Sequence, residues 1–87
     1  MNELNDLRNN IDEIDDSIVK LLSERFDVVK NIAEYKKERG LEIFQQDREA
    51  AVLKRISDKV NNQEYKEYIL KIYAVVLETS KSMQYKL

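Results

Sequence analysis

The chain is 87 residues long, with 43% hydrophobic and 37% charged residues and a formal net charge of −2. This length suits one domain, residues 1–87, at the small end of what can bury its own core. Because there is no polybasic run and the longest uncharged stretch, residues 72–77, is far too short to span a bilayer, we expect neither nucleic acid nor membrane as a partner. The polar, acidic N-terminus and the absence of cysteine favour a cytoplasmic protein.

The residue types that the chain lacks also limit its chemistry. With no histidine and no cysteine, a thiol nucleophile, a Ser-His-Asp triad and ordinary zinc sites are excluded, and no glycine-rich loop is available for a nucleotide phosphate. We therefore expect no metal and no cofactor. Any catalysis must rely on arginine, lysine, carboxylate, amide or hydroxyl side chains, which favours binding and electrostatic stabilisation over covalent catalysis.

The scarcity of turn-forming residues predicts an all-α fold. Proline is absent and Gly40 is the only glycine, whereas an average chain of this length carries roughly four prolines and six glycines. A first helix is predicted over residues 3–39, because apolar residues recur along it at spacings of three and four. They are Leu4, Leu7, Ile11, Ile14, Ile18, Leu21, Val28, Ile32 and Tyr35. Gly40 then suits the left-handed backbone conformation that commonly ends a helix.

Two shorter helices are predicted after a connector at residues 40–46. Asp47 can cap the second helix, which is expected over residues 47–60. A break follows, in which Asn61 begins a capping box for the next helix. The third helix is expected over residues 63–85.

The first helix is too long to be covered by the rest of the chain. About 36 residues at ~1.5 Å per residue give a rod of roughly 54 Å, whereas a compact domain of this size has a radius of gyration of only about 12 Å. An apolar seam of that length requires a second long helix, most simply its own copy. The prediction is an intertwined homodimer with three helices per chain: one long, one short and one medium.

Arg25 breaks the apolar seam of the first helix. Burying an unpaired guanidinium costs several kcal/mol, so Arg25 must face an anion, which is either a carboxylate in an ion pair across the dimer or a ligand. Lys36 returns to the same face about 16 Å along the axis, so the two long side chains can grip a small molecule between them. Arg8 lies about 25 Å before Arg25 and is rotated by roughly 100°, so any pocket that it serves belongs to the partner.

Four residues of the shorter helices add to this set. Arg48 and Glu49 stand in the first turn of the second helix, where Glu49 suits either the helix dipole or a site. Ser80 and Gln84 continue the apolar face of the third helix as hydrogen-bonding residues, either in a site or in a frayed last turn. The candidate interior residues include four cations and one carboxylate, which fits a dianionic ligand better than a self-satisfied network.

The ordered motifs resemble one family. They are Leu7-Arg8-x-x-Ile11-x-x-Ile14-Asp15, Leu21-Leu22-Ser23-Glu24-Arg25, Ile32-Ala33-x-Tyr35-Lys36 and Asp47-Arg48-Glu49, followed by Glu78, Ser80 and Gln84. At these separations the set closely resembles the AroQ-type (all-helical) chorismate mutases over nearly the whole chain. The resemblance implies an intertwined dimer with two equivalent active sites and the conversion of chorismate to prephenate, on the route to phenylalanine and tyrosine.

The resemblance also implies how the substrate is held. Arg8 would reach from the other protomer to one substrate carboxylate, Arg25 would hold the second, and Ser80 would assist at a carboxylate. Lys36 and Gln84 would donate hydrogen bonds to the ether oxygen. Because the reaction is a unimolecular pericyclic rearrangement, no proton is transferred and the lack of histidine is no obstacle.

The remaining matches concern the ring hydroxyl of the substrate. Glu49 would accept a hydrogen bond from it, and Arg48 would support that region. Bacterial members often carry an aspartate three residues before the Arg-Glu pair, where this chain has Gln45. A neutral amide can still bond a hydroxyl, so we expect activity to be retained.

Two other functions stay open at this point. An isochorismate-pyruvate lyase on the same scaffold uses similar cationic clamps and no cofactor, although the Glu49 acceptor and the Lys36–Gln84 pair favour the mutase. The second is a non-catalytic helical dimerisation module, for which Arg25 would be only a structural residue. A mutase segment of a fusion enzyme is also compatible with the sequence.

Overall fold

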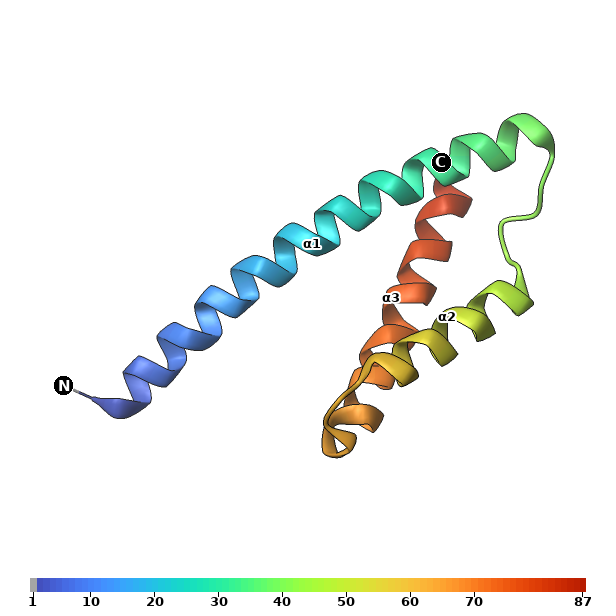
Figure 1. Cartoon of the computed structure of the whole chain (residues 1–87). Helices are drawn as coiled ribbons and strands as arrows, with labels where there is room; N and C mark the ends of the chain where they lie inside the picture. Colours follow the sequence, from blue (N-terminus) through green and yellow to red (C-terminus); the bar gives the residue numbers. More distant parts are fainter. Residues whose placement is uncertain (1) are drawn as a thin grey trace.

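The computed structural model describes residues 2–87, which form three α-helices and one short 3-10 turn (Figure 1). Helix α1 spans Glu3–Arg39, α2 spans Gln46–Lys59, and α3 spans Lys66–Lys86, preceded by the 3-10 segment η1 at Gln63–Tyr65. The described residues contain no strand, so the predicted all-α class with one long, one short and one medium helix is confirmed. Within the same residues, no helix combines the length and the apolar character needed to cross a membrane.

Both ends of α1 are capped, the C-terminal end by Gly40 as predicted. At the start, the Asn2 side chain accepts a hydrogen bond of 2.9 Å from the backbone N–H of Leu4, which satisfies a donor that has no partner inside the helix. At the end, Gly40 adopts a left-handed φ of 65°, and its N–H points back to the carbonyls of Lys36 and Lys37. The basic residues of this last turn also interact favourably with the helix dipole.

The shorter helices start at residues other than the predicted caps. Helix α2 begins at Gln46, so Asp47 lies inside its first turn, where a carboxylate still interacts favourably with the helix dipole. Before α3, the capping residue is Asn62 and not Asn61: the Oδ1 atom of Asn62 accepts a hydrogen bond of 2.9 Å from the N–H of Glu64. Asn62 is the capping residue because the tight 3-10 turn brings the N–H of the second residue after it within reach of its side chain.

Helix α3 packs against both other helices (Figure 1). It runs beside α2, and its C-terminal part meets the C-terminal half of α1. The small core lies where the three helices meet. It consists of Val29 and Ala33 from α1, Val52 from α2 and Ser80 from α3, each at most 7% exposed.

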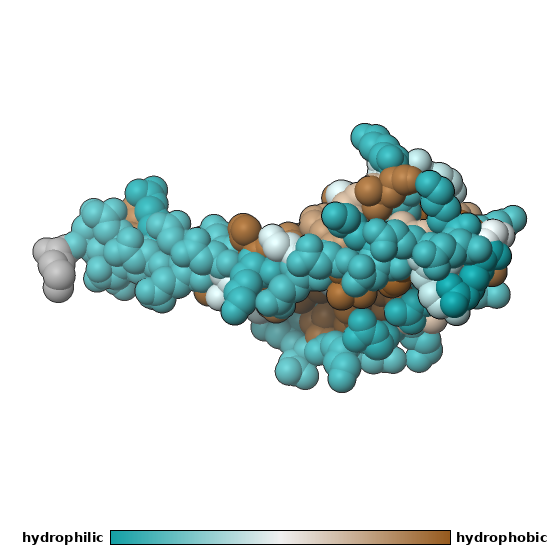
Figure 2. All heavy atoms as spheres, turned by 90° about the horizontal axis from the view of Figure 1, so that it is seen from above, coloured by the Kyte–Doolittle hydropathy of each residue, from teal (hydrophilic) through white to brown (hydrophobic). Residues whose placement is uncertain are grey.

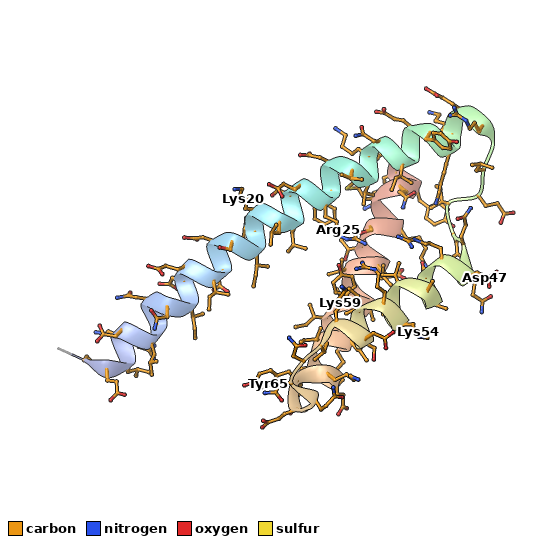
Figure 3. All side chains as sticks on the ribbon, in the orientation of Figure 1. Lys20, Arg25, Asp47, Lys54, Lys59 and Tyr65 are labelled. Carbon is orange, nitrogen blue, oxygen red and sulfur yellow. The ribbon has the colours of Figure 1, made fainter. Side chains whose placement is uncertain are left out.

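The N-terminal half of α1, residues 3–21, forms an arm that projects away from this core (Figures 1 and 2). Figure 3 shows that further along the helix Arg25 points toward α3, whereas Lys20 points away from it. The arm leaves its apolar seam residues 47–62% exposed: Leu4, Leu7, Ile11, Ile14, Ile18 and Leu21.

The overall dimensions reflect this arm. The molecule extends over 58 × 26 × 15 Å, and its radius of gyration of 16.4 Å exceeds the value of about 12 Å for a compact chain of this length. Its accessible surface of 7346 Å² likewise exceeds the roughly 5,400 Å² of a typical folded monomer of this mass. A single copy therefore leaves much apolar surface uncovered.

Candidate active site

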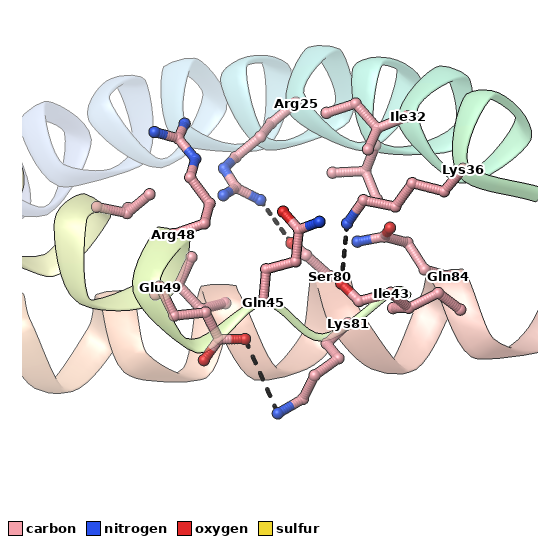
Figure 4. A pocket seen from close by; sticks show the side chains of 13 residues that line it. Arg25, Ile32, Lys36, Ile43, Gln45, Arg48, Glu49, Ser80, Lys81 and Gln84 are labelled. Atoms are coloured by element: carbon pink, nitrogen blue, oxygen red, sulfur yellow. Dashed lines mark hydrogen bonds and ion pairs between the residues drawn. The ribbon is translucent and has the colours of Figure 1, made fainter. Parts of the chain in front are cut away.

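A cleft of about 270 Å³ lies where α1, the connector, α2 and α3 meet (Figure 4). The core residues Val29 and Val52 form part of its apolar lining, together with Ile32 and Leu77. Eight polar side chains complete the lining: Arg25, Lys36, Gln45, Arg48, Glu49, Ser80, Lys81 and Gln84. Seven of these eight are residues that the sequence singled out, so the fold brings together all the predicted site residues except Arg8.

The guanidinium of Arg25 is held in place by α3. Its Nη1 donates a hydrogen bond to the hydroxyl of Ser80, which is only 5% exposed and donates in turn to the carbonyl of Val76 at 2.7 Å. Because the Ser80 proton is engaged there, its oxygen is free to accept from Arg25. The Cζ atom of Arg25 also lies 5.9 Å from the centre of the Tyr73 ring. Arg25 has five N–H donors, so most of them stay available for an anion in the cleft.

Lys36 and Gln84 bring two further donors into the cleft. The Lys36 ammonium donates to the carbonyl of Ile43 at 2.8 Å, which ties the connector to α1 and leaves two ammonium donors for a ligand. Figure 4 shows the amide of Gln84 beside the Lys36 ammonium. The Oε1 atom of Gln84 is buried and has no hydrogen-bond partner among residues 2–87.

The start of α2 supplies the polar rim on the opposite side. Gln45 precedes the helix, and Arg48 and Glu49 stand in its first turn. Gln45 and Arg48 are exposed, whereas the side chain of Glu49 is 31% exposed and its Oε2 lies 3.8 Å from the ammonium of Lys81. Glu49 thus lines the cleft and also lies near the positive end of the helix dipole, so the two expectations for it are compatible.

Lys81 contacts two carboxylates and an aromatic ring. Its ammonium lies 3.2 Å from Oε2 of Glu78, 3.8 Å from Oε2 of Glu49 and 4.5 Å from the centre of the Phe44 ring. The contact with Glu78 raises the pKa of Lys81 above its usual value, partial desolvation opposes this, and the charges of Glu49 and Glu78 raise the pKa further. Lys81 therefore stays protonated at neutral pH.

Lys81 is the one polar lining residue that the sequence analysis did not predict. A signal for it exists, because Leu77, Lys81 and Gln84 follow one another at spacings of four and three and so share one face of α3. The predicted face of α3 includes Ser80 and Gln84 but not Lys81, which lies next to it. With Lys81 included, four cations and one carboxylate line the cleft, which therefore has an excess of positive charge.

Arg8 lies outside the cleft. It is exposed on the arm, 17 residues before Arg25, which corresponds to about 25 Å along a helix. No other helix of its own chain packs against this part of α1 in Figure 1. Its role in a site stays a prediction.

Comparison with known proteins is consistent with this cleft. Residues 7–85 match the model of a family described as chorismate mutase type II. The chain belongs to the chorismate mutase type II family. This membership confirms the resemblance drawn from the motifs and the expected assignment as an enzyme, an isomerase. It also argues against a non-catalytic dimerisation module.

Individual relatives agree with the family match. A chorismate mutase of Methanocaldococcus jannaschii is 35% identical over 83 residues, which cover 94% of this chain and 84% of the relative. A bifunctional chorismate mutase/prephenate dehydratase of Aquifex aeolicus is 33% identical over 92 residues; the match includes all of this chain and 25% of that longer protein. The solved chorismate mutase (form II) of Thermus thermophilus superposes with a TM-score of 0.90 at 25% identity, covering 95% of this chain and 94% of the other.

Proposed function

We propose that the cleft binds chorismate as a dianion and that the chain, as a homodimer, rearranges it to prephenate without a metal or cofactor. The observation that supports this most strongly is the charge of the cleft: four cations but only one carboxylate line a cavity of about 270 Å³. Without a ligand these cations repel one another. A substrate with two carboxylates relieves that repulsion.

Arg25 and Arg8 of a second copy select the reactive shape of the substrate in this proposal. Arg25 binds one carboxylate with the N–H groups that Ser80 does not engage, and Arg8 binds the other from the opposite side. Two fixed clamps hold the compact conformer in which the reacting carbons are close, which removes much of the entropic part of the barrier. Arginine suits both positions because its planar fork matches a carboxylate.

Lys36 and Gln84 stabilise the transition state. As the C–O bond breaks, negative charge grows on the ether oxygen, and two donors already directed at this region stabilise that charge more than they stabilise the ground state. The Lys36 ammonium keeps its position because it is bonded to the carbonyl of Ile43. Removal of one such donor commonly costs two to three powers of ten in rate, or about 3 kcal/mol.

The rim residues of α2 recognise the ring hydroxyl. Glu49 accepts its hydrogen bond, Gln45 offers a neutral amide beside it, and Arg48 supports this end of the cleft and adds to its positive charge. None of these groups transfers a proton, because the rearrangement moves electrons within a single molecule. Their contribution is to orient the substrate.

The uncovered seam of the arm supports a second copy as its partner. Six large apolar side chains repeat along the arm at 47–62% exposure, and the chain has an accessible surface of roughly 2,000 Å² more than expected for a monomer of this mass. A two-fold symmetric pairing of arms covers the same seam on both copies. An excess of that size is sufficient for a stable interface.

Such a pairing also accounts for the isolated position of Arg8. When two α1 helices run antiparallel about a two-fold axis near residues 16 and 17, residue 8 of one copy lies opposite residue 25 of the other. Each cleft then receives Arg8 from the second copy, and the dimer contains two equivalent sites. This arrangement agrees with the role that the family resemblance implies for Arg8.

The deciding experiment is to add chorismate to the purified protein and follow its absorbance. We expect loss of chorismate with prephenate as the product. A parallel incubation with isochorismate, with salicylate as the readout, tests the lyase. Salicylate formation without prephenate would refute the mutase and establish the lyase in its place.

A further inference from the structure

We propose that Lys81 is a positioning residue that holds the carboxylate of Glu49 where it receives the ring hydroxyl of the substrate. The inference rests on the proposed function, because it assigns Lys81 a part in the same site. It goes beyond the roles that the family resemblance assigns, which do not include Lys81.

The surroundings of Lys81 fix its ammonium at the edge of the cleft. The nitrogen lies 3.2 Å from Glu78 on its own helix and 3.8 Å from Glu49 on α2, with the Phe44 ring at 4.5 Å. The side chains of Lys81 and Glu49 are only 23% and 31% exposed, so water screens their attraction less than it screens that of a fully exposed pair. A lysine held by groups on two helices and the connector has little freedom to swing away.

The position of Lys81 determines which cation Glu49 faces. In Figure 4 Lys81 approaches Glu49 from the side opposite to Arg25 and Lys36. Glu49 is the one carboxylate in the cleft lining, so without Lys81 it is attracted toward the cations that bind the substrate. An ion pair between Glu49 and one of those cations would remove both the hydroxyl acceptor and a carboxylate clamp. Lys81 prevents this competition.

A double-mutant cycle tests the positioning role in the complete protein. We expect Lys81→Met to lower kcat/KM about tenfold, within the range observed for side chains coupled in one network. In a Glu49→Gln background the same change should cost less than about twofold, because Lys81 then has no carboxylate to orient. Lys81→Arg keeps the charge and should recover most of the activity.

Lys54→Met is the matched control. Lys54 forms an ion pair of 3.2 Å with Asp58 but is 80% exposed and lies outside the cleft lining, so its loss should leave kcat/KM unchanged. An equal loss from Lys81→Met with and without the Glu49 carboxylate would overturn the proposal, because Lys81 would then act on the substrate directly or only on the fold.

A second measurement does not depend on turnover. The groups that face Lys81 and raise its pKa are Glu78 and Tyr85 on α3 and Glu49 on α2. Titration of the Lys81 side chain by NMR should show a lower pKa in Glu49→Gln than in the wild-type protein. An unchanged pKa refutes the pairing even in an active enzyme, whereas a lowered pKa in a protein that does not consume chorismate refutes the proposed function and with it the catalytic part of this inference.

Discussion

The two halves of α1 have the same apolar repeat but different surroundings. In the C-terminal half, Val29 and Ala33 next to the seam are buried, whereas Ile11 and Ile14 of the arm are 56% and 58% exposed. The seam residues of the C-terminal half itself, Val28, Ile32 and Tyr35, stay 43–55% exposed. The apolar spacing of three and four residues, which predicts a helix, runs through both halves. What differs is that α3 packs against the C-terminal half, whereas no other helix of the same chain packs against the arm.

The arginines of the two halves differ in the same way. Arg25 donates a hydrogen bond to the buried hydroxyl of Ser80 and lines the cleft, whereas Arg8 is exposed on the arm. If a second copy covers the arm, Arg8 gains surroundings like those of Arg25. Substitutions in each half can test whether the arm of one copy completes the cleft of another.

The largest effect is expected from the two arginines. Arg8→Ala and Arg25→Ala should each lower activity at least about a thousandfold, because each leaves a substrate carboxylate without its charged partner in a partly dry site. When the two variants are unfolded together and refolded, mixed dimers contain one site with both arginines intact. Equal mixing should therefore restore about a quarter of the wild-type sites.

The mixing experiment is sensitive to where Arg8 acts. Refolding each variant alone serves as the control and should restore nothing. If turnover by the mixture does not exceed that of the separate variants, Arg8 does not act across the interface. The arm would then contribute to the stability of the protein and not to its active site.

The next effect concerns the donors of the C-terminal half. Gln84→Glu should be active only at low pH, because a carboxyl group donates a hydrogen bond to the ether oxygen only when it is protonated. Activity should fall as the pH rises through the pKa of the introduced carboxyl, and the loss at high pH should approach the two to three powers of ten that a missing donor costs.

The pH profile needs a variant without a titrating group for comparison. Gln84→Ala should be about as slow as Gln84→Glu at high pH, but its profile should follow that of the wild type. A flat profile for Gln84→Glu would contradict the role of Gln84 as a donor in the transition state.

A smaller effect, on stability, tests the arm itself. Ile14→Ala should destabilise a dimer that buries the seam by about 2–5 kcal/mol, as expected for a large-to-small change in a core. On a bare helix the sign changes, because alanine is the better helix former. Thermal unfolding at several protein concentrations distinguishes these cases, since the Tm of a dimer rises with concentration.

Lys20→Ala is the control for this experiment. Lys20 is on the same arm but is not one of the seam residues, and its side chain points away from α3 (Figure 3). Its removal should change the free energy of unfolding by less than about 0.5 kcal/mol. Equal effects at the two positions would mean that the seam is not an interface.

The sequence predicts the helices of this fold better than their exact ends. Spacing alone indicated the three helices, and the polar residues that interrupt the apolar faces, such as Arg25 and Ser80, do line the cleft. The predicted cap Asp47 was wrong by two residues and Asn61 by one, because neighbouring polar residues meet the same local spacing and packing decides between them. Local spacing gives the type of element more reliably than its boundary.

The contacts of the cleft required three-dimensional information. Nothing in the sequence shows that the carbonyl of Ile43 meets the Lys36 ammonium, because the connector has no regular period. Lys81 was not predicted because a lysine next to Ser80 is expected to be solvent-exposed at the side of the helix, and only the structure shows that Glu49 lies beside it. Arg8 cannot be placed in a site from one copy of the chain at all.

Apart from the control variants, the smallest effect is expected at Gly40, where α1 ends at the connector that reaches the cleft. Gly40 has a φ of 65°, and a Cβ added there would meet no heavy atom within 4 Å. The cost of Gly40→Ala is therefore purely conformational, about 1–2 kcal/mol for a left-handed alanine. Gly40→Asn should cost less, because asparagine tolerates this conformation better. Urea unfolding at one fixed protein concentration can measure both.

The activity of the Gly40 variants separates stability from geometry. If the bond between Lys36 and the carbonyl of Ile43 holds the connector in place, the folded Gly40→Ala protein should keep nearly full activity, because the connector is anchored independently of the turn. Loss of activity well beyond the loss of stability would mean that the turn itself sets the position of Lys36. The position of Lys36 would then depend on the Gly40 turn as much as on the packing of α1 against α3.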